Sequence, residues 1–239
     1  MSAYAEEKTE SLYKFNPVTS ASARTLPQWH VAFQKAGGAN INSNFLANSL
    51  SIGILPRFEM GVIPLFYTNK NSSNYTGKVN FWKGDQVDWA FSFTEARFRT
   101  EIKQNAQVIE RPDLILRSMQ LGLNYRIPDS DFTISPFVTS VSGYLNSKDA
   151  VAFIYSYEIK TEWGLDMQWN FQDRQWLTLG YGFLRNSGIS AYEMMSSGFG
   201  FAWSFFRPKE LFSRPSVGLY YTPETANTLF LATSTFYEF

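Results

Sequence analysis

The sequence contains no cysteine and only one histidine, His30, among its 239 residues. The missing thiols exclude disulfide scaffolds and thiolate metal sites, and one imidazole cannot form a multi-histidine metal site. An oxygen-only metal site would need closely spaced acidic residues, and no such motif is present. We therefore expect neither a metal ion nor another cofactor.

An excess of charge of either sign is also lacking, with 21 basic and 21 acidic residues. A balanced chain has no electrostatic footprint for nucleic acid, so we exclude a nucleic-acid partner. Long hydrophobic runs are absent as well, because no segment approaches the roughly 20 apolar residues of a membrane helix. A helical membrane protein is excluded, whereas a membrane β-barrel is not, since its strands are apolar on one face only.

Aromatic residues, in contrast, are abundant: they make up 18% of the chain, with 22 Phe, 13 Tyr and 7 Trp. The aromatic girdles of a lipid-facing surface use such residues. In the segment 151–171 all odd positions except Thr161 are apolar or aromatic, whereas most even positions are polar or small, as in Trp163 beside Glu162. This alternation places the two sets on opposite faces of one strand, which is far longer than the usual soluble strand of about 5–6 residues.

The same alternation recurs along the chain and predicts twelve strands. They lie near residues 25–35, 44–54, 57–67, 76–83, 87–100, 113–127, 131–143, 150–171, 175–185, 193–206, 214–223 and 227–239. Short turn sequences such as 55–57, 83–86 and 128–130 alternate with longer polar stretches such as 68–75 and 100–112. Pro64 and Pro136 fall inside expected strands, so we expect bulges there or different strand limits.

The last expected strand ends on Phe239, and the same face carries Tyr237, Thr235, Thr233 and Leu231. This pattern resembles the C-terminal signal of bacterial outer-membrane β-barrels, in which the barrel-assembly machinery recognises the terminal strand. The resemblance covers residues 25–239. It is a resemblance to this class of proteins as a whole and to no particular family within it. It implies an all-β fold: a closed antiparallel transmembrane β-barrel of about twelve strands, surrounded by outer-membrane lipid and lipopolysaccharide. Tyr237 and Phe239 would form the assembly signal.

A soluble sandwich or lipocalin-like barrel is the competing interpretation. Such folds bury the apolar face and expose the polar one to water. They would have to pack several tryptophans and many phenylalanines into one core, so we favour the membrane barrel. In that barrel the short turns and both chain ends would lie on the periplasmic side.

Residues 1–24 precede the expected barrel and are polar, with no apolar stretch typical of a signal peptide. We expect that a signal peptide has been removed and that Met1 was added for expression. The segment is expected to be flexible, although it could instead fold into the lumen as a plug or contact a periplasmic partner.

Charged residues are expected on the inward face of several strands, where they need partners or water. The candidate pore-lining residues are Glu59, Lys78, Asp88, Glu158, Lys160, Glu162 and Asp166. They could form rings that tune solute passage, or a salt-bridge network that closes the lumen. A barrel of twelve strands is intermediate in size between small barrels, whose interior is filled by side chains, and large barrels that hold a water-filled channel. The number of strands therefore does not decide between these alternatives.

Arg97, Arg99 and Arg117 are expected to face outward, just beyond the apolar part of their strands. Arginine binds phosphate through paired hydrogen bonds, and lipopolysaccharide phosphates would lie at this level. A solvated strand extension is the alternative interpretation.

The expected function is a narrow porin-like channel for small hydrophilic solutes, without strong charge selectivity. A closed structural or interaction barrel that binds lipopolysaccharide or a surface partner is the second candidate. An outer-membrane lipid hydrolase or lipid A-modifying enzyme is the third; it would use His30 as a general base with Ser49 or Ser51 as a partner. No flanking motif supports it, so we expect no enzyme and no catalytic residues.

Overall fold

The computed structural model describes residues 23–39, 44–62, 73–99, 101–110, 113–146, 158–172, 175–183, 197–205, 212–222 and 228–238. All regular elements in these ranges are strands, and none of the described residues forms a helix. No described segment is therefore a helix of the length and apolarity needed to cross a membrane.

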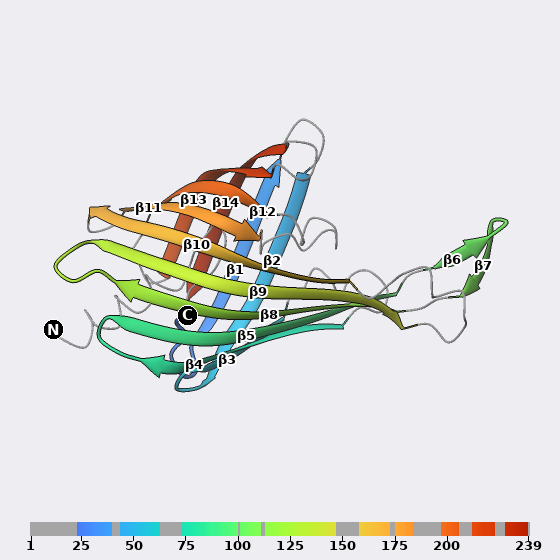
Figure 1. Cartoon of the computed structure of the whole chain (residues 1–239), viewed down its shortest axis with the longest axis horizontal. Coiled ribbons are helices and arrows are strands. Elements are labelled where there is room, and N and C mark those ends of the chain that lie inside the picture. Colours follow the sequence, from blue (N-terminus) through green and yellow to red (C-terminus); the bar gives the residue numbers. More distant parts are fainter. Residues whose placement is uncertain are drawn as a thin grey trace.

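Twelve antiparallel strands form one closed ring (Figure 1), because β1 pairs with β2 on one side and with β14 on the other. In chain order the ring contains β1 (Val31–Ala39), β2 (Asn44–Leu55), β3 (Phe58–Val62), β4 (Ser73–Lys83), β5 (Val87–Arg99), β8 (Asp113–Arg126), β9 (Phe132–Asn146), β10 (Glu158–Gln172), β11 (Gln175–Phe183), β12 (Ser197–Phe205), β13 (Phe212–Thr222) and β14 (Thr228–Glu238). The predicted closed antiparallel barrel of twelve strands is confirmed.

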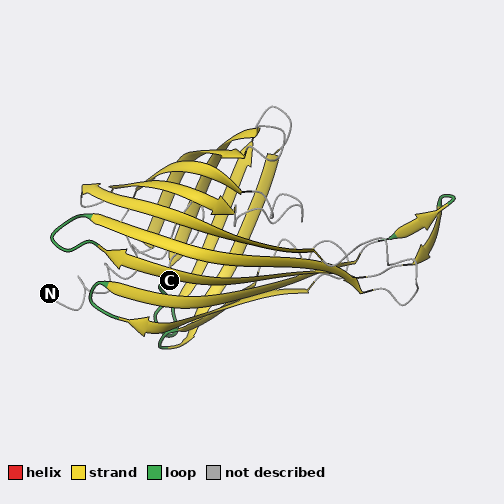
Figure 2. Ribbon diagram, in the orientation of Figure 1, coloured by secondary structure: helices red, strands yellow, loops and turns green. Residues whose placement is uncertain are grey.

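Short turns gather at one end of the barrel, which we call the turn end. They connect β2 to β3, β4 to β5 and β8 to β9, as Figure 2 shows in green. At the opposite end, between β5 and β8, the chain forms a separate hairpin of β6 (Ile102–Gln104) and β7 (Gln107–Glu110) that projects away from the barrel. Asn105 and Ala106 both have positive φ, as the two-residue hairpin turn of type I′ requires. The sequence predicted only an irregular loop here.

On the strands whose side chains are described, the outward face carries an apolar belt. Its exposed residues include Leu50, Met60, Val79, Phe91, Met119, Leu121, Val138, Met167, Leu179, Phe201 and Leu219. Aromatic pairs border the belt. Phe132 stacks on Trp169 toward the turn end, with ring centroids 5.7 Å apart, and Trp163 packs on Tyr181 nearer the other end, at 5.3 Å. An apolar band between two aromatic girdles is the exterior of a barrel that sits in a membrane.

The inward face is polar and tightly packed. Its buried polar residues include Asn74, Asn80, Ser92, Gln120, Asn124, Thr133, Ser135, Thr139, Asp166 and Thr178. Small residues let larger side chains cross the interior: a Cβ at Gly164 would lie 2.0 Å from the ring of Phe137, which therefore rests on the Gly164 backbone. The lumen is thus lined by hydrogen-bonding groups on the strands whose side chains are described.

Two predicted features differ in detail. The first strand begins at Val31 and not near residue 25, because the preceding residues turn into the lumen. Pro136 does lie inside β9, opposite Leu165 of β10, whereas Pro64 lies outside the described residues. On the β8 side the ladder omits Leu123 and Asn124 and resumes in the same register, as expected beside a residue without an N–H.

Candidate functional site: a polar strap across the lumen

Residues 23–27, which we call the strap, lie inside the barrel. Ala23 and Leu26 are 0% and 1% exposed. The strap is joined to β1 by a tight turn in which the His30 N–H donates to the Pro27 carbonyl over 3.2 Å. Trp29 has a φ of 67°, a conformation that favours glycine, so this reversal holds a strained residue.

The turn is fixed to the barrel wall at Gly53. The Trp29 N–H donates to the Gly53 carbonyl over 2.7 Å, and the Gly53 N–H donates to the His30 carbonyl over 2.9 Å. A Cβ on Gly53 would lie 2.0 Å from the Pro27 carbonyl oxygen. Only glycine therefore allows the strap to approach β2 this closely.

From Gly53 the strap passes over β3 and β4. The Leu26 N–H donates to Oε2 of Glu59 over 2.8 Å. The Arg24 carbonyl accepts a hydrogen bond of 2.9 Å from Nζ of Lys78, and this ammonium also lies 3.8 Å from Oε1 of Glu59. Glu59 and Lys78 face each other across the β3–β4 ladder, so their spacing follows from strand register.

Asn80 and Asn124 hold the inner end of the strap. Nδ2 of Asn80 donates to the Ala23 carbonyl over 2.7 Å, and the Ala23 N–H donates to Oδ1 of Asn124 over 3.2 Å. The Ser135 hydroxyl donates to the same Oδ1 over 2.9 Å. Ser135 lies where the β8–β9 ladder is interrupted, so these side chains bridge the gap.

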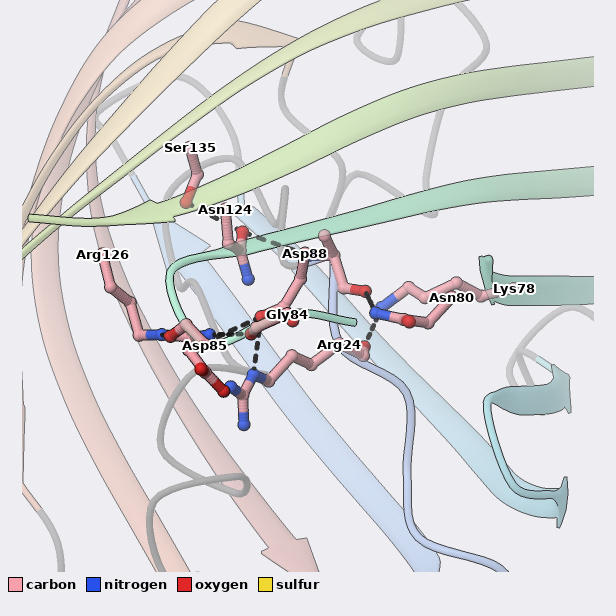
Figure 3. A network of polar contacts seen from close by, with 10 residues as sticks. Arg24, Lys78, Asn80, Gly84, Asp85, Asp88, Asn124, Arg126 and Ser135 are labelled. Carbon is pink, nitrogen blue, oxygen red and sulfur yellow. Dashed lines mark hydrogen bonds and ion pairs between the residues drawn. The ribbon is translucent and has the colours of Figure 1, made fainter. Parts of the chain in front are cut away.

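Asp88 is the centre of the charged network (Figure 3). Its carboxylate is 0% exposed, and Oδ2 accepts from Nε of Arg24 over 2.9 Å and from Nη1 of Arg126 over 2.8 Å. Arg126 also donates to the carbonyls of Gly84 and Asp85 in the β4–β5 turn. A buried carboxylate is stable only with such partners, so the strap arginine compensates the buried charge of Asp88.

The strap therefore crosses five consecutive strands of the ring, β2, β3, β4, β5 and β8, close to the turn end. Three of the predicted pore-lining residues, Glu59, Lys78 and Asp88, are brought together here. The sequence did not single out Arg24, Asn80, Asn124 or Arg126. Position on the inward face marked Asn80 and Asn124 as lumenal, but nothing local showed that a chain segment would bind them.

The other predicted pore-lining residues lie on β10. Asp166 is on its lumenal face and 2% exposed. Glu158, Lys160 and Glu162 pair with Gly143, Val141 and Thr139 of β9, and their side chains lie outside the described part of the structure.

Arg97 and Arg117 face outward, on the same side as Phe91 and Met119. Both bind Glu95, which the sequence analysis did not single out: Nε of Arg97 lies 2.7 Å from Oε1, and Nε of Arg117 lies 2.8 Å from Oε2. Arg99 pairs in register with Asp113, and its side chain is not described.

The remaining predicted residues are only partly described. Tyr237 pairs with Phe33 and with Ser213, but its side chain, like Phe239, lies outside the described residues. The assembly signal therefore stays a prediction. The Gly53 N–H donates to the His30 carbonyl, whereas Ser51 lies opposite Ala32 and Ser49 opposite Gln34. The strand register therefore places neither serine directly across from His30.

The sequence matches no protein-family model and no curated protein. Three solved structures are similar to the chain over most of its length. The toluene transporter TodX of Pseudomonas putida aligns with a TM-score of 0.47 and 9% identity, over 93% of this chain and 91% of that one. The translocator domain of the autotransporter NalP from Neisseria meningitidis gives 0.45 and 12%, over 88% and 87%. OmpT of Vibrio cholerae gives 0.44 and 5%, over 90% and 99%.

No activity is transferred from proteins this distant. The closed ring, its even number of strands and its apolar belt are properties of the chain itself. They show that the chain has the fold of an outer-membrane β-barrel.

Proposed function

We propose that the protein is a narrow channel for small hydrophilic solutes, and that the strap controls its opening at the turn end. The observation that carries this proposal is the polar lumenal face, lined by amide, hydroxyl and paired charged groups. Such groups can exchange hydrogen bonds with water and with polar solutes. An apolar cargo would leave them without partners, which is costly in a confined space.

Weak charge selectivity is expected from the strap network. Three cations, Arg24, Lys78 and Arg126, lie beside two carboxylates, Glu59 and Asp88. The two carboxylates compensate two of the three positive charges, so the network favours anions at most weakly.

The strap suits a movable element because the polar groups of the wall hold it. The strap binds the wall through hydrogen bonds and an ion pair, and water can replace these contacts when the strap moves. Ala23 and Leu26 are its buried apolar residues. Release of the strap would expose a polar surface on five strands and widen the lumen at the turn end.

Single-channel recording in planar bilayers tests the channel. Thr94 faces the lumen, where it donates to Thr76, whereas Thr161 is exposed on the outer face. Thr94→Lys should shift the permeability ratio toward anions, while the matched variant Thr161→Lys should leave it unchanged. Conductance that responds equally to both variants would contradict passage through the lumen.

A closed structural barrel is the second candidate function, and the low exposure of the lumenal polar side chains favours it. In this case the refolded protein would not conduct, with or without weakening of the strap. Circular dichroism would have to show that the silent protein is folded.

A further inference from the structure

We propose that Arg97 and Arg117, held in place by Glu95, bind a phosphate group of an anionic lipid in the outer leaflet. The site lies on the outer wall of the barrel. It rests on the membrane location and is independent of the channel and of the strap.

Strand register places the three side chains together on the lipid-facing surface. Glu95 of β5 lies directly opposite Arg117 of β8, and Arg97 follows two residues later on the same face of β5. Toward the turn end this face continues with Phe93 and Met119, which belong to the apolar belt. The cluster therefore marks the edge of the belt farther from the turn end.

Neighbouring strands become polar at this same edge. Beyond Val138 the outward face of β9 presents Ser140, which accepts a hydrogen bond of 3.2 Å from Thr161 of β10. On β4, Tyr75 lies opposite Glu95, and its ring packs on Phe93 with centroids 5.8 Å apart. A tyrosine next to polar residues at the border of an apolar band is typical of the headgroup level.

The cluster combines a buried anion with two accessible cations. The Glu95 side chain is 2% exposed, whereas those of Arg97 and Arg117 are 44% and 39% exposed. Both arginines therefore stay accessible to a ligand while they bind Glu95.

Glu95 acts as a positioning residue in this site. Each oxygen of its carboxylate accepts from the Nε of a different arginine, at 2.7 and 2.8 Å. Both guanidinium planes are thereby fixed before a ligand arrives, which reduces the conformational entropy lost on binding. Planar guanidinium groups match phosphate oxygens through charge-assisted hydrogen bonds.

The ligand is a lipid phosphate because of the position of the site. The short turns lie on the periplasmic side of such barrels, so the opposite edge of the belt faces the outer leaflet. A phosphate carried by a lipid would meet Arg97 and Arg117 while its acyl chains contact Met119 and Phe93. A free phosphate would lack that second contact.

Native mass spectrometry of the full chain, refolded in detergent and titrated with lipid A, tests the proposal. The wild type should bind phosphorylated lipid A at least about tenfold more tightly than dephosphorylated lipid A, as expected for charge-assisted hydrogen bonds. Arg97→Gln combined with Arg117→Gln should remove this preference. The control Arg57→Gln changes an exposed arginine in the β2–β3 turn and should keep it.

Several outcomes would overturn the proposal. Equal affinity of the wild type for the two lipids would do so even if the double variant failed to fold. A preference that survives in a folded double variant would show that the arginines serve only as an ion-pair network. Displacement of lipid A by inorganic phosphate at similar concentration would indicate a general anion site. Glu95→Gln removes a negative charge, so simple charge attraction would strengthen the preference for phosphorylated lipid A. If Glu95 positions the arginines, the same substitution should weaken that preference.

Discussion

Replacing Asp88 by asparagine should loosen the strap. The substitution keeps the size of the side chain but removes the charge that Arg24 and Arg126 share, at 2.9 and 2.8 Å. Removing one partner of a buried ion pair costs about 3–5 kcal/mol. Arg126 keeps its two carbonyl acceptors in the β4–β5 turn, so the loss falls mainly on the strap arginine. We take the lower figure, about 3 kcal/mol, because the two arginines are 11% and 16% exposed.

The natural absence of cysteine makes thiol labelling a clean assay. Leu26 is 1% exposed, and Leu26→Cys introduces a smaller side chain at a position that a maleimide reagent reaches only when the strap opens. Each 1.4 kcal/mol changes an equilibrium tenfold, so Asp88→Asn should speed labelling about a hundredfold. The comparison is made within the Leu26→Cys background, which cancels the cost of the cysteine itself.

Asp166→Asn is the matched control, because Asp166 is a lumenal carboxylate of similar burial on β10, away from the strands that the strap crosses. It should leave the labelling rate of the cysteine at position 26 nearly unchanged. Equal labelling in the Asp88→Asn variant and its parent would refute the inference that this ion pair secures the strap. Equal acceleration by both substitutions would indicate general loosening of the barrel instead.

Two further predictions concern glycines. Gly53→Ala should displace the strap, because the new methyl would lie 2.0 Å from the Pro27 carbonyl oxygen. It should therefore accelerate labelling of the cysteine at position 26. The control Gly77→Ala should leave the labelling rate unchanged, because the atoms nearest to its methyl are 4.0 Å away. Gly164→Ala should lower the free energy of unfolding by about 1–3 kcal/mol in urea titrations, because the methyl overlaps the Phe137 ring at 2.0 Å. Combining it with Phe137→Leu should restore part of that loss; additive losses would contradict this explanation.

The barrel could be predicted from the sequence because its determinants are local. Alternation places Phe91 outward and Ser92 inward whatever the neighbouring strand, and short turns join strands that are adjacent in the ring. All twelve expected strands correspond to strands of the ring. The described ends differ by up to six residues, and the expected beginning of the long strand at residue 150 lies outside the described residues. The two-stranded extension β6–β7 was missed because its strands have only three and four residues.

The strap could not be predicted, because its partners are far away in the sequence. Arg24 is 64 residues from Asp88, and Ala23 is 101 residues from Asn124. Residues 23–27 have no alternation, and their buried state follows from contacts that exist only once the wall has formed. Glu95 was overlooked for a related reason: its position on an otherwise apolar face is explained only by Arg117, which the register brings opposite.

The closing ladder between β1 and β14 sets the order in which the molecule can be assembled. Ala32 pairs with Glu238, so this seam joins the two extremes of the barrel and is available only after the whole chain has emerged. The wall that binds the strap, from β2 to β8, is complete at Arg126, before the strands from β9 to β14. The strap can therefore dock on an open, curved sheet and be enclosed when the seam closes. After closure it would have to be threaded through a crowded lumen, so early docking is the kinetically simpler route.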